Sequence, residues 1–316
     1  MIKQSLLVRF LSVLKRNKIT EMRGAVDTYA TEIKNDLDII DFDFRDSKSQ
    51  IQALLDRVED DLKRVEDYIT DFKTDLADQI SRYHNEYEIA SQEIYQSQWN
   101  DTPEYILERT AQNAFVEQED YFNFFCNRMA HYVDWRFAGM QFRPAGGHIT
   151  DQIKGLDPLY LVDHHRDLFE EVKKEWHPAY QRRLRYYTVE DTDDNPLEAF
   201  PVNQFSCIIS YDFFNYKPMD LVQKYLEACF ELLVPGGGII FTYNDCDQSH
   251  GVINVEHKWA CYQPKHKMIE MIKELGYEVV FTGDYLANLS WIEAKKPGKL
   301  TSIRGGQTVA QIQSLA

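Results

Sequence analysis

The sequence predicts an α/β protein in which a mostly parallel sheet with flanking helices follows a long helical region. From residue 137 onward, short apolar runs alternate with amphipathic segments of helical spacing. Between residues 26 and 83 the apolar residues recur instead at steps of four and three. Alternating strands and helices form parallel sheets, because each crossover helix carries the chain back to the edge where the previous strand began.

The N-terminal helical region carries an apolar seam in two runs, Val26 to Phe44 and Ile51 to Leu76. Steps of four and three keep apolar residues on one stripe of a helix, which is the heptad signature of a coiled coil. The two runs are out of phase near Ile51, which indicates either a stutter or a break between two helices. The seam is too narrow to bury itself, so we expect a partner helix, most simply through self-association as a coiled coil.

Charged residues surround this seam. Nine carboxylates and four basic residues lie between Asp56 and Asp78, and we interpret them as a solvated helix face. The apolar start, Ile2 to Leu14, has no cleavage site of the kind that follows a signal peptide. We interpret it as an amphipathic helix that packs on a partner helix or, alternatively, lies on a membrane surface.

An aromatic-rich segment connects the two regions. It runs from Ile89 to Trp135 and reads as further helix, with a helix start at Asp101-Thr-Pro-Glu104 because Thr before Pro and Glu is a good N-cap sequence. We therefore divide the chain into a helical oligomerisation region (1–90), a helical connector (91–136), an α/β domain (137–296) and a tail (297–316).

Composition excludes several classes of protein. A formal net charge of −16 argues against nucleic acid as a partner, since phosphate binders are basic. The five cysteines are odd in number and show no C-x-x-C pair, which favours reduced thiols and no zinc site. No apolar stretch reaches the length of a transmembrane span. We expect a cytoplasmic protein or a part of a large assembly.

The elements of the α/β domain are expected at regular intervals. The predicted strands are Ala138–Phe142, Tyr160–Val162, Arg185–Thr188, Ser206–Ser210, Gly238–Tyr243, Tyr277–Thr282 and Leu289–Ala294. The predicted helices are Thr150–Ile153, Arg166–Trp176, Met219–Leu233 and Lys265–Leu275.

The order of these segments, together with the turn Leu233-Val-Pro-Gly-Gly-Gly-Ile-Ile-Phe-Thr242, resembles the class I (Rossmann-like) S-adenosylmethionine-dependent methyltransferase family. In the turn, proline ends the preceding helix and the glycines permit positive φ values. The resemblance covers residues 137–296. It implies a seven-stranded, mostly parallel Rossmann-like sheet with flanking helices, and S-adenosylmethionine as cofactor.

The resemblance also implies a set of cofactor-binding residues. Asp163, followed by His164, ends the second strand, where a carboxylate can accept two hydrogen bonds from the ribose diol; the alternative role of Asp163 is to cap the next helix. After the third strand, Glu190 and Asp191 are candidates for the adenine amino group, with a solvated acidic loop as the alternative. Ser210 ends the fourth strand.

The segment Met140–Ile149 aligns with the glycine loop of the family but departs from it. Gln141 replaces the usual acid, Arg143 the first glycine and Ala145 the second, whereas Gly147 keeps the third. Glycines let the backbone approach the cofactor closely. Either the loop is reshaped so that Arg143 meets the methionine carboxylate, or the pocket is blocked.

The segment after the fifth strand faces the methyl acceptor in the family. It reads as a loop and offers His250 as the first candidate and His257 as the second for the catalytic base of a hydroxyl acceptor. We expect no bound metal, although Asp245, Asp247 and His250 could form a site. The Asn/Asp-Pro-Pro-Tyr/Phe motif of DNA base methylases is absent after the fourth strand.

Two functions follow from these features. The first is a methyltransferase that O-methylates a small-molecule or glycan acceptor and self-associates through its coiled coil. The second is a catalytically degenerate, methyltransferase-like structural or scaffold protein, for example a component of a large assembly such as a virion. The altered glycine loop and the long helical region motivate the second hypothesis.

Overall fold

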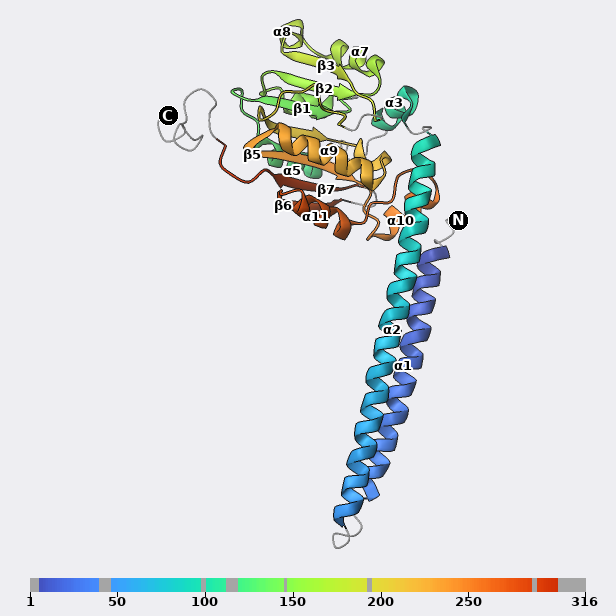
Figure 1. The fold of residues 1–316 in the computed structure, drawn as a ribbon. Helices are drawn as coiled ribbons and strands as arrows, with labels where there is room; N and C mark the ends of the chain where they lie inside the picture. The colour runs from blue at the N-terminus through green and yellow to red at the C-terminus, as the bar shows by residue number, and fades with distance from the viewer. Residues whose placement is uncertain are drawn as a thin grey trace. The chain divides into compact units, whose positions relative to one another are not determined.

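The computed structural model describes residues 6–39, 47–97, 101–111, 119–144, 147–191, 195–285 and 289–300. The chain divides into two compact units, Met1–Glu86 and Tyr87–Ala316. The N-terminal unit contains α1 (Leu6–Ile39) and α2 (Ser47–Ser97) up to Glu86 (Figure 1). Ile51 lies in the second turn of α2, and the residues between α1 and α2 lie outside the described ranges. No helix in the described ranges is both long and apolar enough to cross a membrane.

Partly buried side chains form one stripe on each helix of the N-terminal unit. The stripes contain Met22, Ala25, Tyr29 and Ile33 on α1, and Val58, Val65, Phe72 and Leu76 on α2. Other members of the predicted seam face solvent, among them Val26, Leu55 and Leu62. One set of apolar residues is thus covered within the unit, whereas a second set is left uncovered.

The C-terminal unit is built on one seven-stranded sheet. The strands are β1 (Ala138–Phe142), β2 (Leu159–Asp163), β3 (Leu184–Thr188), β4 (Phe205–Ser210), β5 (Leu233–Tyr243), β6 (Glu278–Tyr285) and β7 (Leu289–Lys295). Their order is β3-β2-β1-β4-β5-β7-β6. The strands β1 to β5 run parallel to one another, and β7 runs antiparallel to both β5 and β6.

Helices cover both faces of this sheet (Figure 1). The helical segments after α2 are α3 (Pro103–Ala111), α5 (Glu119–Ala130), α6 (His148–Gln152), α7 (Arg166–Glu175), α8 (Pro178–Gln181), the 3-10 turn η3 (Phe214–Tyr216), α9 (Met219–Leu232), α10 (Ser249–Glu256) and α11 (Lys265–Glu274). One core joins α9 and α11 to Phe142, Ile208 and Phe241. The other joins α5, α6 and α7 to Leu161 and Ile209. Removing these apolar side chains from water is the main stabilising contribution to such a sandwich.

The local signals in the sequence explain most of these boundaries. Thr102 accepts a hydrogen bond from the Tyr105 backbone N–H (3.3 Å), so it caps α3 as expected. The Pro-Gly-Gly-Gly segment forms the start of β5, which begins at Leu233 rather than at the predicted Gly238. There Gly236 takes the positive φ of 84° that the turn requires.

The segment after β5 was predicted as a loop, and this part of the prediction is wrong. Residues Ser249–Glu256 form α10. The helix packs closely because Gly251 faces the Asp245 carbonyl, where an added Cβ atom would lie only 2.0 Å from the oxygen. Val252 and Val255, three residues apart, are buried on the same helix.

Candidate functional site

Charged side chains gather at the carboxyl ends of the central parallel strands. Arg143 follows β1, His164 follows β2, and Asp212 follows β4. Because parallel strands end at the same edge of a sheet, these residues come together there, where open α/β sheets bind their ligands. Asp101, which lies just before α3, and Asp191, which follows β3, complete the group.

Arg143 is the most buried charge of this group. Its side chain is 4 % exposed and forms an ion pair with Asp101. It also donates a hydrogen bond to the Asp212 carbonyl oxygen (3.1 Å), and its guanidinium lies over the rings of Phe213 and Tyr216, with centroids at 5.3 Å and 5.4 Å. The backbone of Arg143 has a φ of 51°, the left-handed conformation that a glycine adopts without strain.

His164 links two carboxylates. Its Nδ1 lies 2.9 Å from Asp101 Oδ2, and its Nε2 lies 3.1 Å from Asp191 Oδ1. Both ring nitrogens therefore face acceptors, which favours the doubly protonated imidazolium. Burial and the nearby Lys217 ammonium lower the pKa of His164, but the hydrogen bonds to Asp101 and Asp191 outweigh them and raise it overall.

Asp191 is saturated by hydrogen bonds. It accepts from the Lys217 ammonium and from two phenols, Tyr225 (2.5 Å) and Tyr95 (2.9 Å), in addition to His164. Burial alone would raise the pKa of Asp191, but these donors lower it well below its ordinary value. Lys217 is 2 % exposed in its side chain, and desolvation lowers its pKa despite the contact with Asp191.

The charges of this cluster compensate one another. Asp101 binds both Arg143 and His164, which together outweigh burial and lower its pKa. Asp212 accepts from Arg109 Nε (3.1 Å) at the outer side of the cluster. We refer to Asp101, Arg143, His164, Asp191 and Lys217 as the charge network. Ion pairs this deep are stable only when nearly every partner is satisfied, so the network holds its own side chains in place.

Three predicted cofactor residues lie beside the charge network with unpaired polar atoms. Gln141 Oε1, Asp163 Oδ2 and Ser210 Oγ are buried and have no hydrogen-bond partner among the described residues. Within the charge network, Arg143 Nε is likewise buried without a hydrogen-bond partner there. The other oxygen of Asp163 accepts the backbone N–H of His165 (3.2 Å), next to the start of α7. Gln141 and Asp163 point to the same face of the sheet, because Gln141 pairs with Leu161, two residues before Asp163.

The order of the strands identifies the architecture. The sheet has seven strands and is mostly parallel, as the resemblance predicted, and the structure adds an antiparallel pair, β7 and β6, at one edge. The fold is that of the class I methyltransferases. The site described above therefore lies where a class I methyltransferase fold holds its methyl donor, at the carboxyl ends of β1 and β2.

Comparisons with known proteins yield structural similarity only. No protein-family model matches the sequence, and no curated protein matches it. An S-adenosylmethionine-dependent methyltransferase from Clostridium acetobutylicum is 11 % identical, with a TM-score of 0.47 over 60 % of this chain and 96 % of that chain. Human N-acetylserotonin methyltransferase, solved with S-adenosylmethionine, is 11 % identical, with a TM-score of 0.45 over 63 % of this chain and 57 % of that chain. The [4+2]-cyclase SpnF is 9 % identical, with a TM-score of 0.43 over 55 % and 81 %.

The residues present fit one end of S-adenosylmethionine better than the other. Asp163, with one unpaired buried oxygen, suits the ribose diol. Arg143 instead already has its carboxylate partner in Asp101, and Asp191 has no acceptor position left for an adenine amino group. Glu190 is exposed to solvent. The ribose end of the site therefore matches the methyltransferase fold, whereas the partners expected for the methionine and adenine groups are engaged internally.

The remaining predicted site residues that the structure describes share no described contact with the charge network. Gly147 has a φ of 67° and precedes α6, and Ala145 lies outside the described residues. His250 is exposed in the first turn of α10, and His257, just after that helix, stacks on Trp259 with ring centroids 4.8 Å apart. No contact described in the structure joins either histidine to Arg143 or His164.

Several residues of the charge network carried no recognisable signal in the sequence. Asp101 was interpreted only as part of a helix start, and Lys217 did not stand out from other polar residues. The same holds for Tyr225 and Tyr95, which donate hydrogen bonds to Asp191. A lysine that becomes fully buried is visible only after the fold brings Asp191 to it. Three members of the charge network, Arg143, His164 and Asp191, had been predicted as site residues, but the sequence did not show that they contact one another through Asp101 and Lys217.

Proposed function

We propose that this chain is a methyltransferase-like binding and assembly protein whose donor site is closed by its own side chains. The observation that carries the proposal is the buried pair of Arg143 with Asp101 at the position of the glycine loop. Asp101 gives the Arg143 guanidinium a carboxylate partner, which the methionine carboxylate of a bound donor would otherwise be. Opening the site would leave several buried charges without partners, at a cost of several kcal/mol.

The helical region supports an assembly role. Apolar residues Ile19 and Val26 on α1, and Leu55 and Leu62 on α2, are spaced by seven and are between 41 % and 56 % exposed. Heptad spacing of exposed apolar residues is typical of a coiled-coil seam that lacks its partner. The occupant that we propose for this seam is a second copy of the chain, as in the predicted self-association.

Titration calorimetry with S-adenosylmethionine and S-adenosylhomocysteine tests the closed site. The native chain is expected to give no heat at millimolar ligand. A variant that combines Arg143→Gly with Asp101→Asn, which removes both members of the pair and restores the glycine, is the matched comparison. Binding by the native chain with micromolar affinity would overturn the proposal, because a closed site must lose affinity by the fraction of molecules that open.

Light scattering of the purified chain tests the assembly role. The native chain is expected to be a dimer or larger oligomer, and Leu55→Glu with Leu62→Glu is expected to be monomeric because the exposed seam then carries charge. Lys63→Glu, a substitution at the exposed residue that follows Leu62, serves as the control. A monomeric native chain at tens of micromolar would contradict self-association.

A second candidate function is favoured by the unpaired oxygen of Asp163. A buried carboxylate oxygen without a donor costs free energy, and a ribose diol would satisfy it. In this case the chain is an S-adenosylmethionine-dependent methyltransferase that acts on a hydroxyl of a small-molecule or glycan acceptor, with His250 or His257 as the base. Saturable S-adenosylmethionine binding that is lost in Asp163→Asn, together with methyl transfer reduced in His250→Ala, would favour this function.

A further inference from the structure

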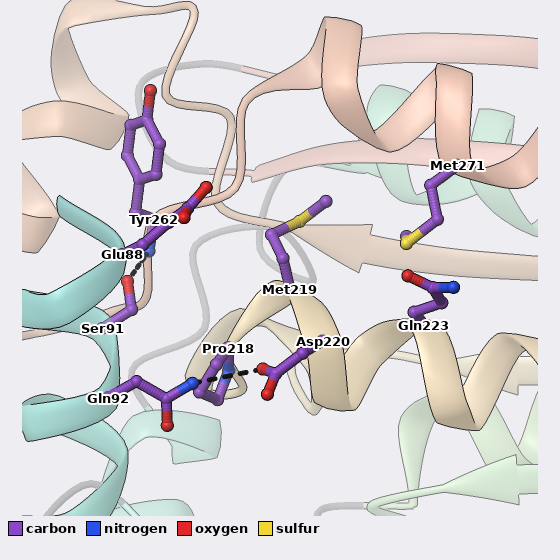
Figure 2. Close-up of a pocket in the computed structure, with 9 residues that line it drawn as sticks. All are labelled: Glu88, Ser91, Gln92, Pro218, Met219, Asp220, Gln223, Tyr262 and Met271. Carbon is purple, nitrogen blue, oxygen red and sulfur yellow. Dashed lines mark hydrogen bonds between the residues drawn. The ribbon is translucent and has the colours of Figure 1, made fainter. Parts of the chain in front are cut away.

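A cavity of about 420 Å³ lies within the C-terminal unit, away from the charge network. Figure 2 shows that its walls come from the last turns of α2, the start of α9, α11 and the segment before α11. Its lining includes Glu88, Gln92, Met219, Asp220, Tyr262 and Met271. Its volume lies in the range of sites that bind small molecules or single side chains, roughly 300–1,000 Å³.

The polar part of the lining is acidic. Asp220 lies in the first turn of α9, is exposed, and accepts one hydrogen bond from Gln92 Nε2 (3.3 Å). No cation pairs with Asp220 within the described ranges of the chain. Glu88, on the other wall, shares its carboxylate with Lys267 (2.9 Å). The cavity thus holds two carboxylates against one ammonium group, in a protein whose net charge already attracts cations.

The rest of the lining is apolar and adaptable. Met271 is buried on α11, and Met219 is half-buried on α9; Figure 2 shows both thioethers directed toward the cavity. Thioether side chains adjust to ligands of different shape. The Tyr262 ring is buried and stacks on Tyr87, with centroids 5.2 Å apart, and its backbone N–H is fixed by Ser91 Oγ (2.7 Å). One wall is therefore rigid, whereas the methionine side can adapt.

We propose that this cavity binds an alkylammonium group, that is, a protonated primary amine on an unbranched apolar chain. The amine would pair with Asp220 and replace the single neutral hydrogen bond from Gln92, and the chain would lie against Met219 and Met271. An anion is disfavoured, because Asp220 already occupies the positive end of the α9 dipole. A free polyamine and the lysine side chain of a partner protein share this chemistry.

Binding of n-hexylamine to the full-length chain, followed by methyl NMR of the methionines and by calorimetry, tests the assignment. We expect saturable binding that shifts the methyl signals of Met219 and Met271, and binding of n-hexanol that is at least about fivefold weaker because a charged hydrogen bond is lost. Spermidine and Nα-acetyl-lysine methylamide then distinguish the two sources. Tighter binding of spermidine indicates a free polyamine, and tighter binding of the lysine derivative indicates a protein side chain.

Asp220→Asn is the decisive variant, because it keeps the shape of the side chain and removes its charge. It is expected to weaken n-hexylamine binding about fivefold, as for an exposed ion pair. Glu227→Gln, an exposed carboxylate farther along α9, is the matched control and is expected to bind as the native chain does. Melting temperatures of both variants verify that they fold.

Two results would overturn the assignment. One is equal affinity for n-hexanol and n-hexylamine, which would make the cavity merely apolar. The other is the absence of n-hexylamine binding at millimolar concentration in the native chain. Neither result bears on the closed donor site, because no residue that lines the cavity belongs to the charge network.

Discussion

The guanidinium of Arg143 and the carboxylate of Asp101 form an ion pair between the residue after β1 and the residue before the Thr102 cap of α3. The pair ties the connector to the sheet edge at which the methyltransferase fold holds its cofactor. Since His164 binds the other oxygen of Asp101, one carboxylate fixes two cations on neighbouring strands. The stability of the C-terminal unit and the proposed closure of its site therefore depend on the same residues.

Arg143→Met is expected to lower the free energy of unfolding by about 3 kcal/mol. The substitution keeps an unbranched side chain but leaves Asp101 buried with only His164 as a charged partner. Urea unfolding followed by tryptophan fluorescence measures the change. Lys154→Met removes the exposed ion pair with Asp151 (3.0 Å) and should cost less than about 1 kcal/mol. Equal effects of the two substitutions would show that the buried pair contributes no more than a surface pair.

The stability supplied by His164 is expected to depend on pH. Its pKa in the folded protein is raised above the unfolded value of about 6.5. Its contribution is therefore complete below pH 6.5 and is lost as pH rises through the folded pKa. Urea titrations of the native chain and of His164→Gln at several pH values from 6 upward measure this difference. It should be largest at the acid end; a difference that grows toward alkaline pH would refute the doubly protonated state.

Glu293 on β7 anchors α5 to the sheet. The Glu293 side chain is 2 % exposed and accepts hydrogen bonds from Arg128 Nε (2.5 Å) and from the Tyr132 hydroxyl (2.7 Å). Arg128→Met should cost about 3 kcal/mol because it leaves a buried carboxylate without a cation, whereas Tyr132→Phe should cost about 1 kcal/mol. Denaturant unfolding gives both values. A larger loss for Tyr132→Phe would mean that the phenol, not the guanidinium, carries the contact.

Gly251→Ala is expected to destabilise the chain, whereas Gly24→Ala should stabilise it. A Cβ atom at Gly251 would lie 2.0 Å from the Asp245 carbonyl oxygen, so α10 must move, at a cost of about 1–3 kcal/mol. Gly24 lies inside α1 with nothing within 4 Å of the added atom, and alanine there should gain about 0.5–1 kcal/mol. Thermal unfolding monitored by circular dichroism compares the two. A neutral Gly251→Ala would indicate that α10 is held only loosely.

The strands could be predicted because burial leaves a strong local pattern. The strand Ala138–Phe142 was predicted with its observed bounds, as its residues are all buried and lie between polar segments. The helix α10 could not, because its three apolar positions, Val252, Ile253 and Val255, are too few to show a period and its N-cap position, Gln248, makes no side-chain cap. Its packing depends on contacts with Asn244 and Asp245, which the local pattern does not reveal.

The candidate site was predictable only in part. Asp163 could be placed from its position at the end of a strand, since that position is a property of the local sequence. The partner of Arg143 could not be placed, because Asp101 precedes it by 42 residues and belongs to another element. The partners of Asp191 come from three further segments, so they could not be predicted from the sequence either. Which residues of opposite charge pair with each other is decided only when the fold sets the distances between them.

The antiparallel strand β7 lies between β5 and β6, although it follows both in the sequence. During synthesis β6 therefore emerges before β7, with which it pairs, and the open edge of β5 pairs with the same segment. A nascent chain that has not yet exposed Leu289–Lys295 presents two unpaired strand edges, a state prone to intermolecular pairing. The synthesis of Leu289–Lys295 thus decides whether the sheet closes on itself or on a neighbouring nascent chain.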